Sequence, residues 1–209
     1  MEHSTEHDAE AAGADGGAKR HAVNIVLIGP SASGKTTLAR ALEDLGVRRI
    51  RSYTTRPRRP QEGTRADYEF VSDWEFESLR QSRSMSVVRE YRVASGDVWK
   101  YGVSLRDFDD DISPADTVCI LDAEGYMELR SIVPRVFGVL LDIPEDVRER
   151  RIIARGDDRE ESRRRLHADE KAFSWITEHA DDACSMVIHK IESPKNEAVM
   201  VLRKIRASF

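Results

Sequence analysis

The chain has 209 residues, of which 40% are hydrophobic and 34% are charged, and its formal net charge is −5. This composition excludes a wholly disordered chain, a collagen and a coiled coil, and the longest apolar runs are far shorter than a membrane-spanning helix. Two cysteines, Cys119 and Cys184, are too few for a disulfide framework or a zinc site. The N-terminus lacks the basic and then apolar pattern of a signal peptide, so we expect a cytoplasmic protein without a membrane partner.

Arginine supplies most of the positive charge and is concentrated in two blocks, 51–65 and 148–165. Its planar guanidinium suits phosphate oxygens. A protein that binds a long nucleic acid usually carries a basic domain, so local arginine clusters in an acidic chain favour small phosphorylated ligands over nucleic acid. We expect a monomer or a homodimer.

Residues 1–21 contain almost no apolar side chains, which predicts a disordered tail, and one domain is expected at 22–209. Strands are predicted at 23–28, 47–52, 67–71, 117–121, 136–141 and 185–188. Helices are predicted at 35–45, after Ser72, after Pro144, after Asp158 and at 195–207; at Ser72, Glu75 completes a capping box. The segments 85–93 and 98–103 are typical of an antiparallel pair of strands.

This order of elements predicts an α/β fold. Strands that alternate with helices form a parallel sheet with helices on both faces. The section 53–103 interrupts the alternation, so we expect an inserted lobe with antiparallel or mixed strands. The core would then be formed by 22–52 and 104–209.

A phosphate-binding motif lies between the first predicted strand and the first predicted helix. The segment Gly29-Pro-Ser-Ala-Ser-Gly34-Lys35-Thr36 fits the pattern G-x-x-x-x-G-K-[ST] in the context that this pattern requires. Backbone N–H groups and the helix N-terminus would hold phosphates, Lys35 would reach the β- and γ-phosphates, and Thr36 would ligate Mg²⁺. We therefore expect ATP and Mg²⁺ on a P-loop NTPase-type sheet, bound by Gly29, Pro30, Ser31, Ala32, Ser33, Gly34, Lys35, Thr36 and Thr37.

A second anion site is indicated about twenty residues further on. Arg56 and Arg59 offer two guanidinium groups and Tyr68 a hydroxyl at one end of the predicted lobe. Such a set can hold one phosphate group bidentately. From charge alone, a solvated basic loop is the favoured interpretation of this segment.

These segments resemble the guanylate kinase family. The family pattern S-x-T-T-R-x-x-R-x-x-E-x-x-G-x-D-Y-x-F-V is closely matched by 52–71, and Tyr101-Gly102 follows the hairpin as in the family. The segment 117–122 is similar to the family's central strand, which ends in an acid. Arginines within about 151–168 are similar to its helical lid. The resemblance extends from about Ala22 to the C-terminus.

The resemblance implies a reaction and a set of site residues. ATP would phosphorylate GMP or dGMP, with Mg²⁺ as cofactor. The acceptor monophosphate would be bound by Ser52, Arg56, Arg59, Tyr68 and Tyr101. Glu90 would accept hydrogen bonds from guanine N1–H and the 2-amino group, and Asp122 would lie near the acceptor and the metal. The catalytic residues would be Lys35, Arg151, Arg155 and Arg165. The remaining helical arginines, Arg148, Arg150, Arg159, Arg163 and Arg164, are expected on solvated faces.

Four departures from the family pattern leave the acceptor open. Val103 replaces a hydroxyl residue after Tyr101-Gly102, and the hairpin before it is about two residues longer than usual. Ala123-Glu124-Gly125 is shorter than the family's segment, and His189-Lys190 replaces an Asn-Asp pair. The alternatives are a kinase of the same fold that acts on another nucleoside monophosphate or on ribose 1,5-bisphosphate, and a protein-binding module without catalysis. Lys35, which such modules usually lack, disfavours the last.

Overall fold

The computed structural model describes residues 21–58, 66–82, 84–93, 96–109, 111, 114–154, 156 and 159–209, with 159–162 and 165 described by backbone alone. The predicted tail, apart from His21, lies outside these residues, and so do Arg59 and Arg155. None of the helices in the described ranges is long and apolar enough to cross a membrane.

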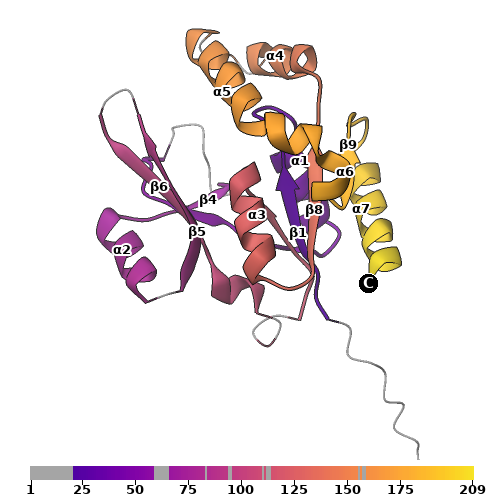
Figure 1. The fold of residues 1–209 in the computed structure, drawn as a ribbon, viewed down its shortest axis with the longest axis horizontal. Coiled ribbons are helices and arrows are strands. Elements are labelled where there is room, and N and C mark those ends of the chain that lie inside the picture. Colours follow the sequence, from indigo (N-terminus) through magenta and orange to yellow (C-terminus); the bar gives the residue numbers. More distant parts are fainter. Residues whose placement is uncertain are drawn as a thin grey trace, which may run out of the picture.

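A five-stranded parallel sheet forms the centre of the molecule (Figure 1). Its strands are β1 (Asn24–Ile28), β2 (Arg48–Arg49), β7 (Thr117–Ile120), β8 (Val136–Leu141) and β9 (Met186–Ile188), in the order β2-β7-β1-β8-β9. Every pairing in this sheet is parallel. All five residues of β1 are buried, as expected for a strand covered on both faces. The predicted α/β fold with a parallel sheet is confirmed.

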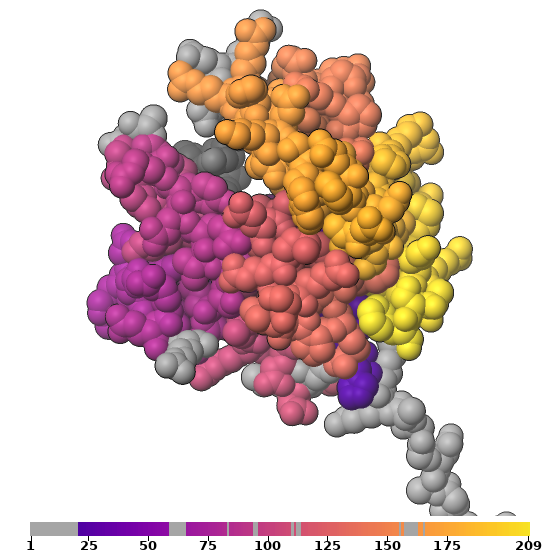
Figure 2. All heavy atoms as spheres, in the orientation of Figure 1, coloured from indigo at the N-terminus to yellow at the C-terminus, as the bar shows by residue number. Residues whose placement is uncertain are grey.

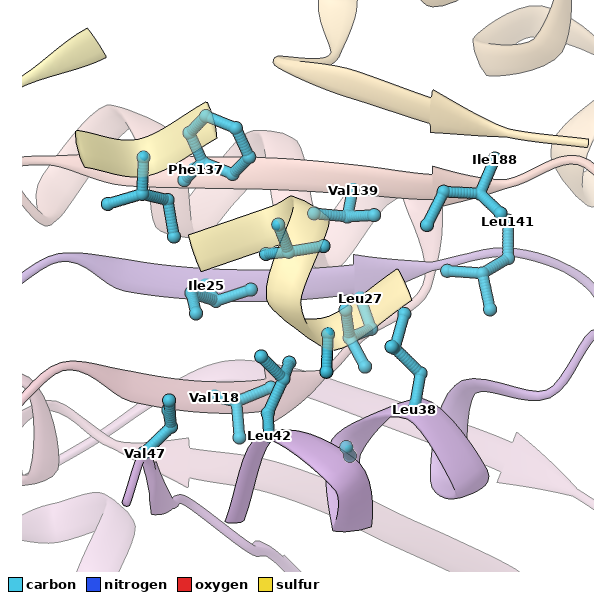
Figure 3. Packing of buried hydrophobic residues seen from close by; sticks show 14 of the residues in the cluster. Ile25, Leu27, Leu38, Leu42, Val47, Val118, Phe137, Val139, Leu141 and Ile188 are labelled. Atoms are coloured by element: carbon cyan, nitrogen blue, oxygen red, sulfur yellow. The ribbon is translucent and has the colours of Figure 1, made fainter. Parts of the chain in front are cut away.

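Two helical layers cover the sheet. On one face α1 (Lys35–Glu43) and α7 (Pro194–Ser208) enclose a cluster that includes Ile25, Leu27 and Leu38, and Figure 3 shows these side chains interdigitated between strands and helices. On the other face, Val26 and Ile28 belong to a cluster with α3 (Ala123–Ile132) and α5 (Arg159–Glu178). Alternate residues of β1 thus enter opposite cores. The shorter elements are η1 (Leu105–Phe108), α4 (Glu145–Ala154) and α6 (Ala180–Ala183).

A second sheet forms a lobe beside the core, shown in magenta in Figures 1 and 2. Its strands are β3 (Ser52–Thr54), β4 (Tyr68–Phe70), β5 (Met85–Arg92) and β6 (Val98–Ser104), in the order β4-β3-β6-β5. The β3–β4 pair is parallel and the other two pairs are antiparallel. The lobe also carries α2 (Asp73–Gln81), which begins with the predicted capping box of Ser72 and Glu75. We use "lobe" for β3 to β6 together with α2.

The predicted strand 47–52 is two strands. Its first part is β2 at the edge of the central sheet, and its last residue begins β3 in the lobe. Between them, Ile50 is buried and its N–H donates to the carbonyl oxygen of Val118 at 2.8 Å. The chain therefore leaves the core at Ile50, a change of partner that an extended run of residues does not reveal.

Candidate active site

The phosphate-binding loop joins β1 to α1. Gly29 has a φ of 146° and Gly34 a φ of 107°, conformations that favour glycine. At Gly29 a Cβ atom would also lie 2.7 Å from the carbonyl oxygen of Leu141. The first turn of α1 has no acidic residue, so its positive end faces the loop without a competing carboxylate. The predicted loop thus has the backbone of an anion site.

Two cationic side chains lie against this loop. The Lys35 ammonium donates to the carbonyl oxygens of Gly29 at 2.6 Å and Pro30 at 2.7 Å. The Arg151 Nη1 donates to the carbonyl oxygens of Ala32 and Ser33, both at 2.9 Å. Lys35 was predicted from the phosphate-loop motif and Arg151 from the similarity to a helical lid, and the structure brings both side chains to the same loop. Arg155 and the Arg165 side chain lie outside the described part of the chain.

Thr36 links the loop to the lobe through Asp67. Its Oγ1 donates to Asp67 Oδ2 at 2.9 Å, and Asp67 Oδ1 lies 3.6 Å from Arg49 Nη2. Burial lowers the pKa of Arg49, while Asp67 raises it. Asp67 had no role in the sequence-based site, although it stands directly before Tyr68 in the matched motif. It joins segments that are 31 residues apart.

Helix α5 reaches the loop from the opposite side. The Ser31 N–H donates to Asp169 Oδ2 at 2.7 Å, a contact between residues 138 positions apart that no sequence pattern indicated. Arg164 of the same helix is exposed, as expected for a solvated face, and also lines the cavity described below. Arg148 was expected on a solvated face too, and this expectation is wrong: Arg148 is buried, because its guanidinium turns back to the segment between β8 and α4, where its Nε donates to the Ile143 carbonyl oxygen at 3.1 Å.

A cavity of about 890 Å³ connects the loop, the lobe and α5. Figure 2 shows the magenta lobe and the orange α5 on either side of the same indentation. Gly29, Ser31 and Lys35 line one end. The lobe contributes residues from all its strands, and β7 and α5 complete the wall; the residues used below are Ser52, Tyr68, Arg89, Tyr91, Tyr101, Val103, Asp122 and Arg164.

The predicted acceptor-phosphate residues gather at the lobe wall. Ser52, Tyr68 and Tyr101 all line the cavity, and the rings of the two tyrosines meet edge to face at 5.6 Å. Arg56 is buried with its guanidinium 5.3 Å from the centre of the Tyr68 ring, and its Nη1 donates to the Pro57 carbonyl oxygen at 2.9 Å. Arg56 therefore lies behind Tyr68 rather than on the cavity surface.

Glu90 is not brought to this cavity. The pairing of β5 with β6 shifts by one residue between Ser86 and Arg89, where Val87 has a φ of 52°. Beyond this bulge Arg89 pairs with Tyr101, and Glu90 is exposed and pairs with Lys100 on the opposite face. Because side chains alternate along a strand, one extra residue reverses the face of every later one.

Arg89 and Tyr91, the two neighbours of Glu90 in β5, line the cavity instead. The Nη1 of Arg89 lies 2.9 Å from Glu128 Oε2, and its Nε lies 3.8 Å from Asp122 Oδ2. Asp122 Oδ2 also accepts from the Tyr91 hydroxyl at 2.9 Å, and Asp122 Oδ1 caps α3. Burial and the neighbouring Asp122 raise the pKa of Tyr91, so its hydroxyl remains a donor at neutral pH.

Two further departures noted in the sequence are placed by the structure. Val103 is fully buried and belongs to the core cluster that includes Val87. His189 follows β9, and its Nδ1 lies 3.2 Å from Asp142 Oδ2. Val103 therefore contributes packing at the base of β6 rather than a polar group for the acceptor.

Comparisons with known proteins agree with the fold and with the loop. A family model described as guanylate kinase matches residues 21–190. The chain is 35% identical over 144 residues to a guanylate kinase of Haemophilus influenzae, covering 65% of this chain and 66% of that one. It is 32% identical over 166 residues to a guanylate kinase of Symbiobacterium thermophilum, covering 74% and 72%.

A solved structure is similar as well. The crystal structure of guanylate kinase from Anaplasma phagocytophilum has a TM-score of 0.63 and 25% sequence identity, and the match covers 91% of this chain and 87% of that one. The alignment to the Haemophilus protein spans slightly less than two thirds of that relative's length. The family model nevertheless covers most of this chain, including the phosphate loop, the lobe and α5. The chain belongs to the guanylate kinase family.

Proposed function

We propose that the protein transfers the γ-phosphoryl group of ATP to GMP in the cytoplasm, forming ADP and GDP. One observation carries the proposal: a single cavity is lined both by Lys35 of the phosphate loop and by Ser52, Tyr68 and Tyr101 of the lobe. A donor and an acceptor anion bound at these two places would face each other. The relatives described above, named guanylate kinases, support this reaction.

The chain's own residues supply positioning and positive charge. Lys35 and Arg151, which now donate to loop carbonyl oxygens, would turn to the phosphates of the donor. Arg164, on the α5 side of the cavity, adds a third cation. Phosphoryl transfer needs the two reactants in line and its developing charge stabilised. The acceptor is already a phosphate oxygen, so a base with a strongly shifted pKa is not required.

The residues at Thr36 fit Mg²⁺. The Thr36 proton is directed to Asp67, which leaves the oxygen lone pairs available for a metal. Among the described residues, no group of three His, Cys, Asp or Glu side chains is arranged to hold a metal ion, and Mg²⁺ in such sites is typically held by few protein ligands together with nucleotide phosphates. Bound there, the ion would neutralise charge on the transferred phosphates.

A second acceptor, ribose 1,5-bisphosphate, is favoured by the exposed position of Glu90 and by the apolar Val103. Its second phosphate would have to enter the part of the cavity beside Arg89. That guanidinium lies within 4 Å of three carboxylates, those of Asp122, Glu124 and Glu128, so this region does not attract another dianion. We therefore rank GMP first.

The test measures ADP formation with GMP, dGMP, IMP, AMP and ribose 1,5-bisphosphate. We expect GMP or dGMP to give the highest kcat/KM. Lys35→Ala should lower kcat by about 10²-fold or more, the scale of losing one charge-stabilising donor. A kcat/KM for ribose 1,5-bisphosphate above that for GMP would show that GMP is not the preferred acceptor. Activity of Lys35→Ala within tenfold of wild type would contradict the proposed kinase mechanism.

A further inference from the structure

The bulge in β5 determines which side chains face the bound acceptor. Tyr101 lines the cavity, and its cross-strand partner is Arg89, so both side chains lie on the cavity face of the lobe. Tyr91, two residues on, shares this face and packs edge to face on Tyr101 at 5.5 Å. Without the bulge, Val88 and Glu90 would have occupied these positions. On the cavity face, Arg89 therefore stands in the place of Val88 and Tyr91 in the place of Glu90, so this face carries a guanidinium and lacks the expected carboxylate.

Glu128 of α3 holds this arrangement. Its Oε1 accepts from the Val87 N–H at 2.9 Å, at the bulge itself, and its Oε2 accepts from Arg89 Nη1 at 2.9 Å. One carboxylate thus fixes both the irregular backbone and the guanidinium that follows it. Arg89 also donates from Nη1 to the Val88 carbonyl oxygen at 2.9 Å. Its orientation is therefore determined before any acceptor binds.

Arg89 keeps hydrogen-bonding capacity. Both of its hydrogen bonds to described residues are made by Nη1. Its Nε is buried and has no hydrogen-bond partner among the described residues, since the nearest carboxylate oxygens lie 3.7 and 3.8 Å away. Its Nη2 also makes no hydrogen bond to the described residues and is not among the buried atoms, so the Nη2 N–H groups can donate to a ligand atom in the cavity.

We propose that Arg89 recognises the 6-oxo group of the acceptor purine, with Asp122 as the acceptor for N1–H. This inference rests on the proposed function. Guanine and hypoxanthine both present O6 and N7 as acceptors, whereas adenine presents an amino donor at position 6. A donor-only guanidinium therefore discriminates the 6-oxo purines from adenine.

Asp122 supplies the complementary acceptor. Its Oδ2 already accepts from Tyr91, and a carboxylate oxygen can accept a further bond. With Glu90 on the outer face, β5 offers no carboxylate to the 2-amino group of guanine. The site should therefore treat IMP much as it treats GMP, which separates this arrangement from one based on Glu90.

The experiment compares Arg89→Gln and Arg89→Lys with the matched control Glu90→Gln, one residue away on the opposite face. For each protein, kcat/KM is measured for GMP, IMP and AMP, together with the KM for ATP and the melting temperature. In the wild type we expect the kcat/KM values for GMP and IMP to lie within about tenfold of each other, and the value for AMP to be lower by about 10²-fold or more. Arg89→Gln should lower kcat/KM for both GMP and IMP by about 10- to 100-fold, which is the scale of a lost charge-assisted hydrogen bond.

Glutamine can pair with adenine, so Arg89→Gln should also narrow the preference for GMP over AMP. Arg89→Lys keeps the positive charge but lacks the planar guanidinium donors, so it should have a GMP-to-AMP preference between those of the wild type and Arg89→Gln. It also provides the test if Arg89→Gln does not fold. The ATP KM of both variants, and all parameters of Glu90→Gln, should stay within about threefold of wild type.

The possible failures are distinguishable. A wild type without GMP turnover contradicts the proposed function itself. A wild type that phosphorylates GMP contradicts the inference in any of three ways: it rejects IMP by more than 10²-fold relative to GMP, it keeps its GMP-to-AMP ratio in the Arg89 variants, or it loses that ratio in Glu90→Gln.

Discussion

Asp169 places a negative charge at a loop that is built for anions. Its carboxylate accepts the Ser31 N–H at 2.7 Å, and it lines the same cavity as Lys35. A phosphate that approaches this loop needs such N–H groups and is repelled by a carboxylate among them. Asp169 would therefore compete with the proposed donor, ATP, for the loop in the arrangement seen here. Its position on α5 makes the competition depend on where that helix lies.

Asp169→Asn should strengthen ATP binding. Asparagine retains an oxygen that can accept the Ser31 N–H, so the loop stays supported while the charge is lost. Removing one like charge at about 4 Å is worth about 1 kcal/mol in a well-solvated cleft, or about fivefold in Kd. Titration calorimetry with a non-hydrolysable ATP analogue measures this change. Glu170→Gln, the exposed neighbour on α5, is the control, and an unchanged or higher Kd for Asp169→Asn would show that the carboxylate supports the bound donor instead.

At the scale of single elements, β5 shows how a correct strand can present the wrong residues. The bounds of the antiparallel pair were predicted within one residue at each end. The face on which Glu90 lies was predicted wrongly, because no sequence pattern indicates the bulge. Its residue of positive φ is Val87, a β-branched residue that rarely adopts this conformation. The bulge is instead fixed from outside the strand by Glu128, which lies 41 residues away. A tertiary contact thus overrides the local preference.

The packing of α3 on β8 depends on Gly138. A Cβ atom added there would lie 2.7 Å from Cε2 of the Tyr126 ring, whose hydroxyl donates to the Ala183 carbonyl oxygen at 2.7 Å. Because both ends of the tyrosine are held, Gly138→Ala should destabilise the protein by about 1–3 kcal/mol through overpacking. Urea denaturation gives the free energy of unfolding, with Tyr126→Leu added to relieve the contact.

Gly46→Ala is the comparison for this prediction. Gly46 has a φ of 91° and nothing lies within 4 Å of an added Cβ, so its substitution costs backbone strain alone, about 1–2 kcal/mol. The free energy of unfolding lost through Gly138→Ala should be smaller in the Tyr126→Leu background than in the wild type. The loss through Gly46→Ala should be the same in both backgrounds. Strictly additive losses in both pairs would mean that the Gly138 contact is relaxed elsewhere.

For the whole molecule, the sequence predicted the arrangement of strands and helices but not the contacts that join the core to the lobe and to α5. Alternating apolar strands and helices predicted the parallel sheet and the phosphate loop at its first strand, since both are determined by local patterns. The crossing at Ile50 and the contacts of Thr36 with Asp67 and of Ser31 with Asp169 were missed. Each joins segments whose spacing in the sequence carries no signal, and each lies where the core meets the lobe or α5.

Cys119 can report whether this assembly unfolds as one unit. It lies in β7, is fully buried, and burial raises the pKa of its thiol to about 12. At pH 8 the native thiolate fraction is therefore on the order of 10⁻⁴. The second thiol, Cys184, is half-buried and is removed by Cys184→Ala. Alkylation of Cys119 in that variant should then require opening of the central sheet.

We expect this labelling at pH 8 to be slow and to accelerate with urea below the midpoint, with the same slope that describes global unfolding. The raised pKa also sets the pH dependence: unfolding releases the thiol proton above about pH 9, so the free energy of unfolding should fall as pH rises from about 9 towards 12. If ATP binds the folded loop, as proposed, it should slow labelling in proportion to its occupancy. Labelling that ignores urea and ATP would mean that β7 is reached by local opening, independent of the loop and the lobe.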